Sequence, residues 1–221
     1  MKRILALLRT DIGRKAVMGL TGLLLIAFLV THMLANLLVL FSPAGYNAYS
    51  EHLTSNPLIY LAELGLVVLF IGHFVSGIIV WRRNRGARPT AYQMKVYADR
   101  TGRKSLASTT MIVSGLVMLV FVPLHIATFK FGPYYMTADG QERDLYRLVV
   151  EIFHSPLYTL WYLVALPILG THAWHGFGSG FESLGVAYSK ELRRFGQALA
   201  VVLTIGFMAV PIYVILGGGA S

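Results

Sequence analysis

Two histidines three positions apart, His172 and His175, stand near the end of a strongly apolar stretch, in the segment HAWHGFGSGFESLG. Residues i and i+3 share one face of a helix, so both imidazoles, or only one, could reach the same bound group. Imidazoles in such positions bind zinc, ligate the iron of a haem or form structural hydrogen bonds. The segment alone leaves these three alternatives open.

Most of the other histidines also lie in apolar surroundings. The five that lie within long apolar stretches are His32, His73, His125, His172 and His175. An ionisable side chain at membrane depth is costly and marks a functional site by default. The remaining two, His52 and His154, are expected to be polar residues at the membrane boundary. Four separate stretches therefore each carry a histidine suited to binding a buried group.

The elements that must position these histidines are predicted to be membrane-spanning helices. The 221 residues are 56% hydrophobic and only 13% charged, and the mean hydropathy is +0.63, which is typical of an integral membrane protein. Crossing a hydrocarbon core takes about 20 helical residues. The sequence predicts an all-α protein, with one transmembrane domain over 1–221, no signal peptide, and five spans at approximately 15–41, 58–81, 105–129, 157–181 and 197–216.

The basic residues predict the orientation of these spans. Of the 19 Lys and Arg residues, all except Lys130, Arg143 and Arg147 lie in the N-terminal segment or in the second and fourth loops. Such loops face the cytoplasm by the positive-inside rule. We therefore expect a cytoplasmic N-terminus and an external C-terminus. The net charge of +9 reflects this topology, so no nucleic-acid partner is expected.

Depth in the membrane sorts the histidines into pairs. With a helix rise of about 1.5 Å per residue, His32 and His125 lie toward the outside, whereas His73 and His172 lie toward the cytoplasm, on a level about 15 Å away. One zinc site cannot use both levels, because its ligands lie within about 2 Å of the metal. Two bis-histidine haems can, if the first four helices form a bundle around them. The absence of cysteine excludes protein-ligated iron–sulfur clusters in this chain.

A flat porphyrin also needs space beside the helices. Gly77 and Gly176 each follow an inner histidine by four positions, where a glycine lets a ring approach the helix backbone. Asn36 and Phe129 take the equivalent positions after the outer histidines, so only the inner pair follows this pattern.

Six segments together resemble a known family. They are GRKAVMGLTG, THMLAN, GYNAYSEHLTSNPLIYLAELGL, GHFVSG, PLHIATF and HAWHGFGSGFESLG. In order, spacing and depth, the chain resembles the five-helix, dihaem cytochrome b membrane anchor of succinate dehydrogenases and fumarate reductases, the succinate:quinone oxidoreductases of respiratory complex II. The resemblance covers essentially the whole chain.

The resemblance implies which residues bind two haems b. His73 and His172 would hold the inner haem, and His32 and His125 the outer haem. In the family, the last ligand is followed by glycines in the pattern H-x3-G-x8-G, which Gly176 and Gly185 satisfy only for His172. His175 would lie beside the inner haem or a lipid headgroup without ligating iron. Candidate cations for the haem propionates are Arg14, Lys15, Arg82 and Arg83 inside and Lys130 outside. Positive-inside topology and lipid phosphates explain such residues better than any particular propionate contact does.

The resemblance also implies a function within a larger enzyme. A flavoprotein with FAD and an iron–sulfur protein would dock on the cytoplasmic face of a prokaryotic membrane, because this chain has no domain for either cofactor. Electrons would pass through the haems to a quinone, or in the reverse direction during fumarate reduction. The dihaem form resembles family members that use menaquinone more than those that use ubiquinone. The chain would not be catalytic for succinate on its own, and the whole complex could form a higher oligomer.

One carboxylate is a candidate for delivering protons to the quinone. Glu63 near the outer end of the second span could deliver protons to quinone, or could face headgroups as a boundary residue; Glu51 and His52 are weaker candidates.

Two other functions are alternatives to the succinate:quinone oxidoreductase anchor. The chain could instead be the dihaem anchor of a hydrogenase or formate dehydrogenase. It could also be a haem-free transport or structural protein, with histidines that serve packing or a proton relay.

Overall fold

The computed structural model describes residues 10–86, 110–187 and 189–219, and within them the chain is built from helices without a β-strand. The elements are α2 (Asp11–Leu37), the 3-10 turn η1 (Leu38–Leu40), α3 (Pro43–Thr54), α4 (Leu58–Gly86), α6 (Met111–Phe129), α7 (Leu145–His154), α8 (Pro156–Ser183) and α9 (Lys190–Ile215). The predicted start of the third span, 105–109, and the basic residues of 1–9 and 87–109 lie outside the described residues.

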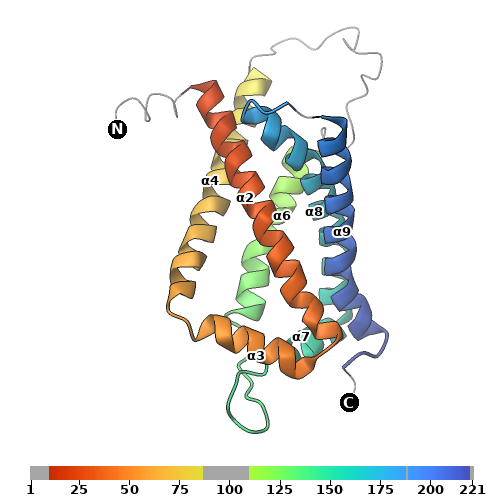
Figure 1. The fold of residues 1–221 in the computed structure, drawn as a ribbon. Helices are drawn as coiled ribbons and strands as arrows, with labels where there is room; N and C mark the ends of the chain where they lie inside the picture. The colour runs from red at the N-terminus through yellow and green to blue at the C-terminus, as the bar shows by residue number, and fades with distance from the viewer. Residues whose placement is uncertain (1–9, 87–109, 188, 220–221) are drawn as a thin grey trace.

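Five long helices run along the molecule, and two short ones lie across one end (Figure 1). We call the end where α2 begins the Asp11 end, and the opposite end, where α3 and α7 lie, the α3 end. At the Asp11 end, Arg83 of α4 donates a hydrogen bond to the Asp11 carboxylate of α2. Because α2, α6 and α9 run away from the Asp11 end while α4 and α8 run toward it, successive spans are antiparallel.

Four helices, α2 with η1, α4, α6 and α9, are each long and apolar enough to cross a membrane, and the pair α7–α8, bent by 95°, makes a fifth candidate. This agrees with the prediction of an all-helical chain that crosses the membrane several times. The helices differ from the predicted spans at their polar ends, because α2 begins at Asp11 and α9 at Lys190. The hydroxyls of Thr10 and Ser189 cap these first turns and allow the helices to start outside the apolar stretch.

The two short helices lie between the predicted spans, in segments where no helix was predicted. In α3, the hydroxyl of Ser42 caps the N-terminus and Pro43 occupies the first turn, where proline needs no hydrogen-bond partner for its nitrogen. In α7, the carboxylate of Asp144 caps the first turn by accepting from the Arg147 amide. Buried Asn47 joins the two helices, since its amide donates to Asp144 at 3.0 Å and accepts from the Tyr146 backbone at 2.8 Å.

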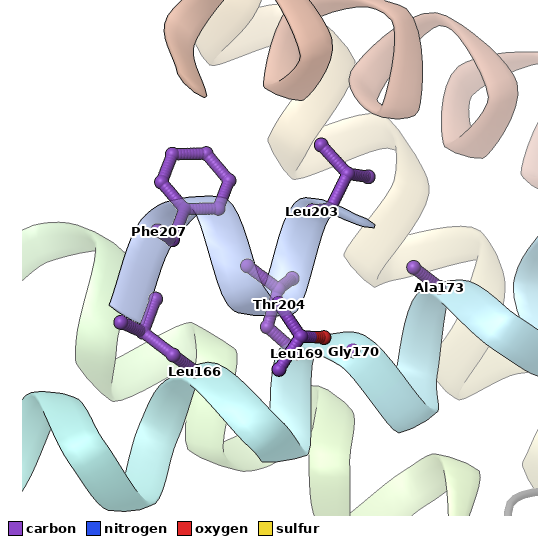
Figure 2. Close-up of a pocket in the computed structure, with 7 residues that line it drawn as sticks. All are labelled: Leu166, Leu169, Gly170, Ala173, Leu203, Thr204 and Phe207. Carbon is purple, nitrogen blue, oxygen red and sulfur yellow. The ribbon is translucent and has the colours of Figure 1, made fainter. Parts of the chain in front are cut away.

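Small residues let α8 approach α2 and α9 closely. A Cβ on Gly19 of α2 would lie 2.8 Å from the Gly180 carbonyl oxygen of α8, so this crossing needs glycine. Figure 2 shows the second contact, where Gly170 of α8 faces Thr204 of α9 among apolar side chains. A side chain on Gly170 would overlap the Thr204 hydroxyl. Helix α8 is therefore held between its two neighbours at a fixed depth.

Helix α4 is the least buried of the long helices. Ser76 is its one buried residue, whereas α8 has nine. Large apolar side chains along α4, such as Leu64 and Val68, are 60% and 62% exposed. In a membrane such a helix contacts lipid, another subunit or a bound group rather than its own bundle alone.

Candidate functional site

One pair of histidines lies nearer the Asp11 end, and we call it the Asp11-end pair. The rings of His73 on α4 and His172 on α8 face each other with centroids 6.1 Å apart and planes at 76°. The Nδ1 atom of His73 lies 3.0 Å from the Met18 carbonyl oxygen of α2. The Nδ1 atom of His172 lies 2.9 Å from the Ser114 hydroxyl of α6. Four helices thus position two half-buried imidazoles.

A second pair, the α3-end pair, lies toward the opposite end. His32 on α2 and His125 on α6 have ring centroids 5.7 Å apart and planes at 87°. The Nδ1 atom of His125 lies 2.9 Å from the Tyr162 hydroxyl of α8. The Nε2 atom of His32 instead lies 3.4 Å from the Asn36 amide nitrogen, one turn later on the same helix.

Polar and aromatic residues surround the α3-end pair. Phe28 stacks on His32, and Phe121 stacks on His125, each with nearly parallel rings. Tyr46 of α3 donates to the Asn36 side chain at 3.4 Å and closes this end of the site. Burial raises the pKa of Tyr46 to about 12, so its phenol stays neutral and available as a donor.

The two pairs occupy separate levels of the bundle. Ser114, which contacts the Asp11-end pair, and His125 are eleven positions apart on α6, or about 16 Å along the helix. Met18 and His32 are fourteen positions apart on α2, or about 21 Å. This separation is close to the one expected from sequence. It is too large for all four imidazoles to bind one ion.

The spacing within each pair fits a bis-histidine haem. Two imidazoles on opposite sides of one metal have centroids roughly 6 Å apart, because each ligating nitrogen lies about 2 Å from the metal. The observed 6.1 and 5.7 Å agree with this spacing. Among the described residues, a Cβ built on Gly77 or Gly176 would meet no atom within 4 Å. Both glycines therefore border open space one turn from the Asp11-end pair, as a flat ring beside the helices requires.

A zinc-like centre does not fit the same residues. No group of three or more His, Asp or Glu side chains converges in the part of the chain that the structure describes. Metal ions bound by protein side chains alone need about three or four such ligands. Two opposed imidazoles instead match a group that supplies its own equatorial ligands, as a porphyrin does.

The remaining predicted residues near the Asp11 end lie around the pair rather than between its rings. His175 is half-buried on α8, and it is the His172 ring that packs against His73. Arg14 forms an ion pair of 3.5 Å with Asp11, which also pairs with Arg83. The predicted cations Lys15 and Arg82 are exposed, near the start of α2 and near the end of α4.

The structure pairs the predicted carboxylate of α4 with a cation at the α3 end. Glu63 and Lys130, which follows the last residue of α6, form an ion pair in which the two side chains are 35% and 41% exposed. The ammonium group also lies over the rings of Tyr60 and Phe131, at 6.0 and 5.8 Å from their centroids. Lys130 was one candidate cation for a propionate, and its partner in this structure is Glu63.

Sequence reasoning missed the residues that hold the histidine rings. Ser114 and Tyr162 bond to ring nitrogens from helices other than those of their histidines. No motif marks such contacts, because they depend on how the helices rotate and cross. Gly22 carries the one available signal, since it belongs to the GRKAVMGLTG segment and packs against His73.

Comparison with known proteins identifies the family. A model of the family "Succinate dehydrogenase/Fumarate reductase transmembrane subunit" matches residues 84–213. The matched region contains His125, His172 and His175 and begins after His32 and His73. No curated protein and no solved structure matches the chain. Because the family match covers more than half of the 221 residues and the helices are those of a membrane protein, this chain belongs to the transmembrane subunits of succinate dehydrogenase and fumarate reductase.

Proposed function

We propose that this chain is the dihaem cytochrome b anchor of a succinate:quinone oxidoreductase. His73 and His172 would hold one haem b, and His32 and His125 the other. The observation that carries the proposal is the presence of two opposed imidazole pairs, with ring centroids 6.1 and 5.7 Å apart, on separate levels of one bundle. A haem bound at each level would supply one-electron transfer between the two ends of the membrane domain.

The residues of the chain itself bind, orient and shield these groups. The imidazole rings would ligate the iron. The Met18 carbonyl oxygen and the hydroxyls of Ser114 and Tyr162 contact the Nδ1 atoms of His73, His172 and His125, respectively. Such contacts fix ring orientation and leave Nε2 free for a metal. Within a membrane, the apolar side chains of the bundle would help to shield both levels from water.

The charge distribution supports an orientation and a docking face. At the Asp11 end, the described basic residues outnumber the acidic ones. The basic residues are Arg14, Lys15, Arg82, Arg83, Arg85, Lys190, Arg193 and Arg194, and the acidic residues are Asp11, Glu182 and Glu191. At the α3 end, six acidic residues outnumber the three described basic ones, Lys130, Arg143 and Arg147. The acidic residues are Glu51, Glu63, Asp139, Glu142, Asp144 and Glu151. By the positive-inside rule, the Asp11 end faces the cytoplasm of a prokaryote. Arg14, Lys15 and Arg82 there would meet haem propionates, lipid phosphates or acidic partner subunits.

As a transmembrane subunit, the chain associates with other subunits of the enzyme in a membrane complex. We infer that the flavoprotein with FAD and the iron–sulfur protein dock at the Asp11 end. The iron–sulfur clusters would belong to the iron–sulfur protein, since this chain has no cysteine to ligate them.

The ion pair of Glu63 and Lys130 supports a quinone site at the α3 end, with menaquinone as the proposed substrate. Reduction of a quinone takes up two protons, and a carboxylate beside the reacting oxygens can deliver them. Glu63 lies half-buried where α4 meets the end of α6, with Tyr60 close by. Lys130 can hold the carboxylate in place or attract the negative charge that develops on the quinone.

The intact complex provides the test. His32→Ala or His125→Ala should remove the α3-end haem and abolish succinate:quinone activity, while succinate oxidation by soluble artificial acceptors stays largely unchanged. His154→Ala, at the exposed end of α7, is the matched control and should behave as wild type. Full quinone activity in the His32 and His125 variants, or quinone bound at the Asp11 end, would contradict the proposal.

A further inference from the structure

We propose that Ser114 on α6 and the Met18–Gly22 turn of α2 are positioning elements that fix the tautomer and orientation of His172 and His73. The inference rests on the proposed function, because it concerns how these imidazoles present Nε2 to a haem. It goes further in assigning roles to residues that touch the ligands without binding iron.

The contact between His73 and Met18 fixes where the ring proton lies. A backbone carbonyl oxygen can only accept a hydrogen bond, so the Nδ1 atom of His73 must donate across the 3.0 Å to Met18. In a neutral imidazole the other nitrogen, Nε2, then has a free lone pair. The Thr21 hydroxyl lies 3.4 Å from the same Nδ1 and gives its own proton to the Val17 carbonyl at 2.7 Å, so it too faces His73 as an acceptor.

Gly22 allows the His73 ring to reach this carbonyl. A Cβ at position 22 would lie 2.9 Å from Cε1 and 3.2 Å from Nδ1 of the ring, closer than such atoms normally approach. An alanine would therefore push the imidazole away from α2. Gly72, the neighbour of His73 on α4, differs because a Cβ there would meet Thr21 at an ordinary 3.9 Å. The two glycines thus form a matched pair for substitution.

Ser114 plays the corresponding part for His172. Its hydroxyl donates to the Met111 carbonyl at 3.0 Å, which uses the one proton of this group. With that proton directed to Met111, the oxygen accepts from Nδ1 of His172 at 2.9 Å, and in this proposed arrangement Nε2 of the ring is also free. Ser114 is only 3% exposed, so water does not replace this contact easily. Both rings of the Asp11-end pair are consequently set for coordination through Nε2.

The α3-end pair is arranged differently. The Tyr162 hydroxyl beside His125 can donate or accept, and an Asn36 amide nitrogen lies 3.4 Å from Nε2 of His32. Neither contact forces Nε2 to be free. Substitutions at Gly22 and Ser114 should therefore affect one haem and leave the other as an internal reference.

Loss of the Ser114 hydroxyl, which accepts from Nδ1, should lower the basicity of the His172 imidazole. A hydrogen bond from Nδ1 raises the basicity of an imidazole and stabilises the oxidised metal. In Ser114→Ala, the midpoint potential of the Asp11-end haem should rise, while that of the α3-end haem stays at its wild-type value. Ser114→Thr, which keeps the hydroxyl, should restore the potential.

The experiment compares purified complexes by redox titration of the haem bands and by electron paramagnetic resonance of the oxidised haems. His172→Ala and His32→Ala identify which signal belongs to which level. Gly22→Ala should shift or remove the Asp11-end signal alone, and Gly72→Ala should keep both. If Gly22→Ala prevents assembly, the Ser114 variants decide.

The outcomes separate the inference from the proposed function. Wild-type complex without two haems would contradict the proposed function. Two haems in the wild type, with unchanged potential in Ser114→Ala and unchanged signals in Gly22→Ala, would overturn the positioning roles alone. Equal shifts of both haems would also overturn them, because a local contact cannot act on both levels.

Discussion

The Nδ1 atom of His125 lies 2.9 Å from the hydroxyl of Tyr162, and this contact joins α6 to α8 at the level of the α3-end pair. Tyr162 is only 5% exposed and packs edge-on against Phe121 and Phe153. His125 thus contacts the main apolar core through Tyr162, whereas its partner His32 contacts Phe28 and Asn36 of its own helix and Phe207 of α9.

Tyr162→Phe should weaken the binding of the α3-end haem without affecting the other level. If Nε2 of His125 binds the iron, Nδ1 would carry the ring proton and donate a hydrogen bond to the Tyr162 oxygen, a contact that contributes about 1 kcal/mol. Redox titration should show a higher midpoint potential for the α3-end haem in this variant. Tyr158→Phe, a nearby tyrosine that bonds to Thr128 instead, is the control and should keep both potentials. A shift of the Asp11-end haem alone would argue against the assignment.

The neighbouring histidines of α8 should behave differently when each is replaced. His172→Ala should lose the Asp11-end haem, because this ring faces His73. His175→Ala should keep both haems. Haem quantification of the two purified variants distinguishes them, and the reverse result would make His175 the ligand and show that the glycine spacing was misread.

Glu63→Gln should slow quinone turnover by about a hundredfold, as expected when a group that delivers protons is lost. Both haem bands should remain, since a partly exposed ion pair contributes at most about 1 kcal/mol to folding. Steady-state assays with a soluble quinone measure the effect, and Glu151→Gln on the exposed surface of α7 serves as the control. Wild-type turnover in Glu63→Gln would mean that the pair with Lys130 is only structural.

Asn47→Ala should destabilise the α3 end while leaving the haems in place. The change removes the acceptor of the Tyr146 backbone N–H and the donor to Asp144, at a cost of about 1–3 kcal/mol. Thermal unfolding in detergent should therefore begin at a lower temperature. Replacement of exposed Gln141 with Ala is the control and should leave the unfolding temperature nearly unchanged. An equal drop in unfolding temperature in both variants would show that the Asn47 hydrogen bonds do not stabilise the α3 end.

The sequence predicted the long helices well because their apolar stretches are continuous. It did not predict where they begin, since α2 and α9 start with charged turns that hydropathy excludes but capping hydroxyls permit. Helices α3 and α7 were missed because they are too short to cross a membrane. Their caps, Ser42 before Pro43 and Asp144 before an apolar segment, were the available signals.

Depth arithmetic grouped the four histidines as the structure does, because helix rise is regular enough to place a residue within a turn. That these rings ligate haem remains a prediction. The residues behind the rings could not be found this way. Ser114 and Tyr162 face His172 and His125 only because of the rotation of α6 and α8, which no spacing in one helix encodes.

The number of haems per chain tests the central claim most directly. Purified complex should contain two haems b per copy of this chain by pyridine haemochrome assay. Its reduced-minus-oxidised spectrum should be that of low-spin haem, because imidazole fills both axial positions at each level. One haem per chain, or a high-spin spectrum, would contradict the two-pair arrangement, and no haem at all would contradict the proposed function.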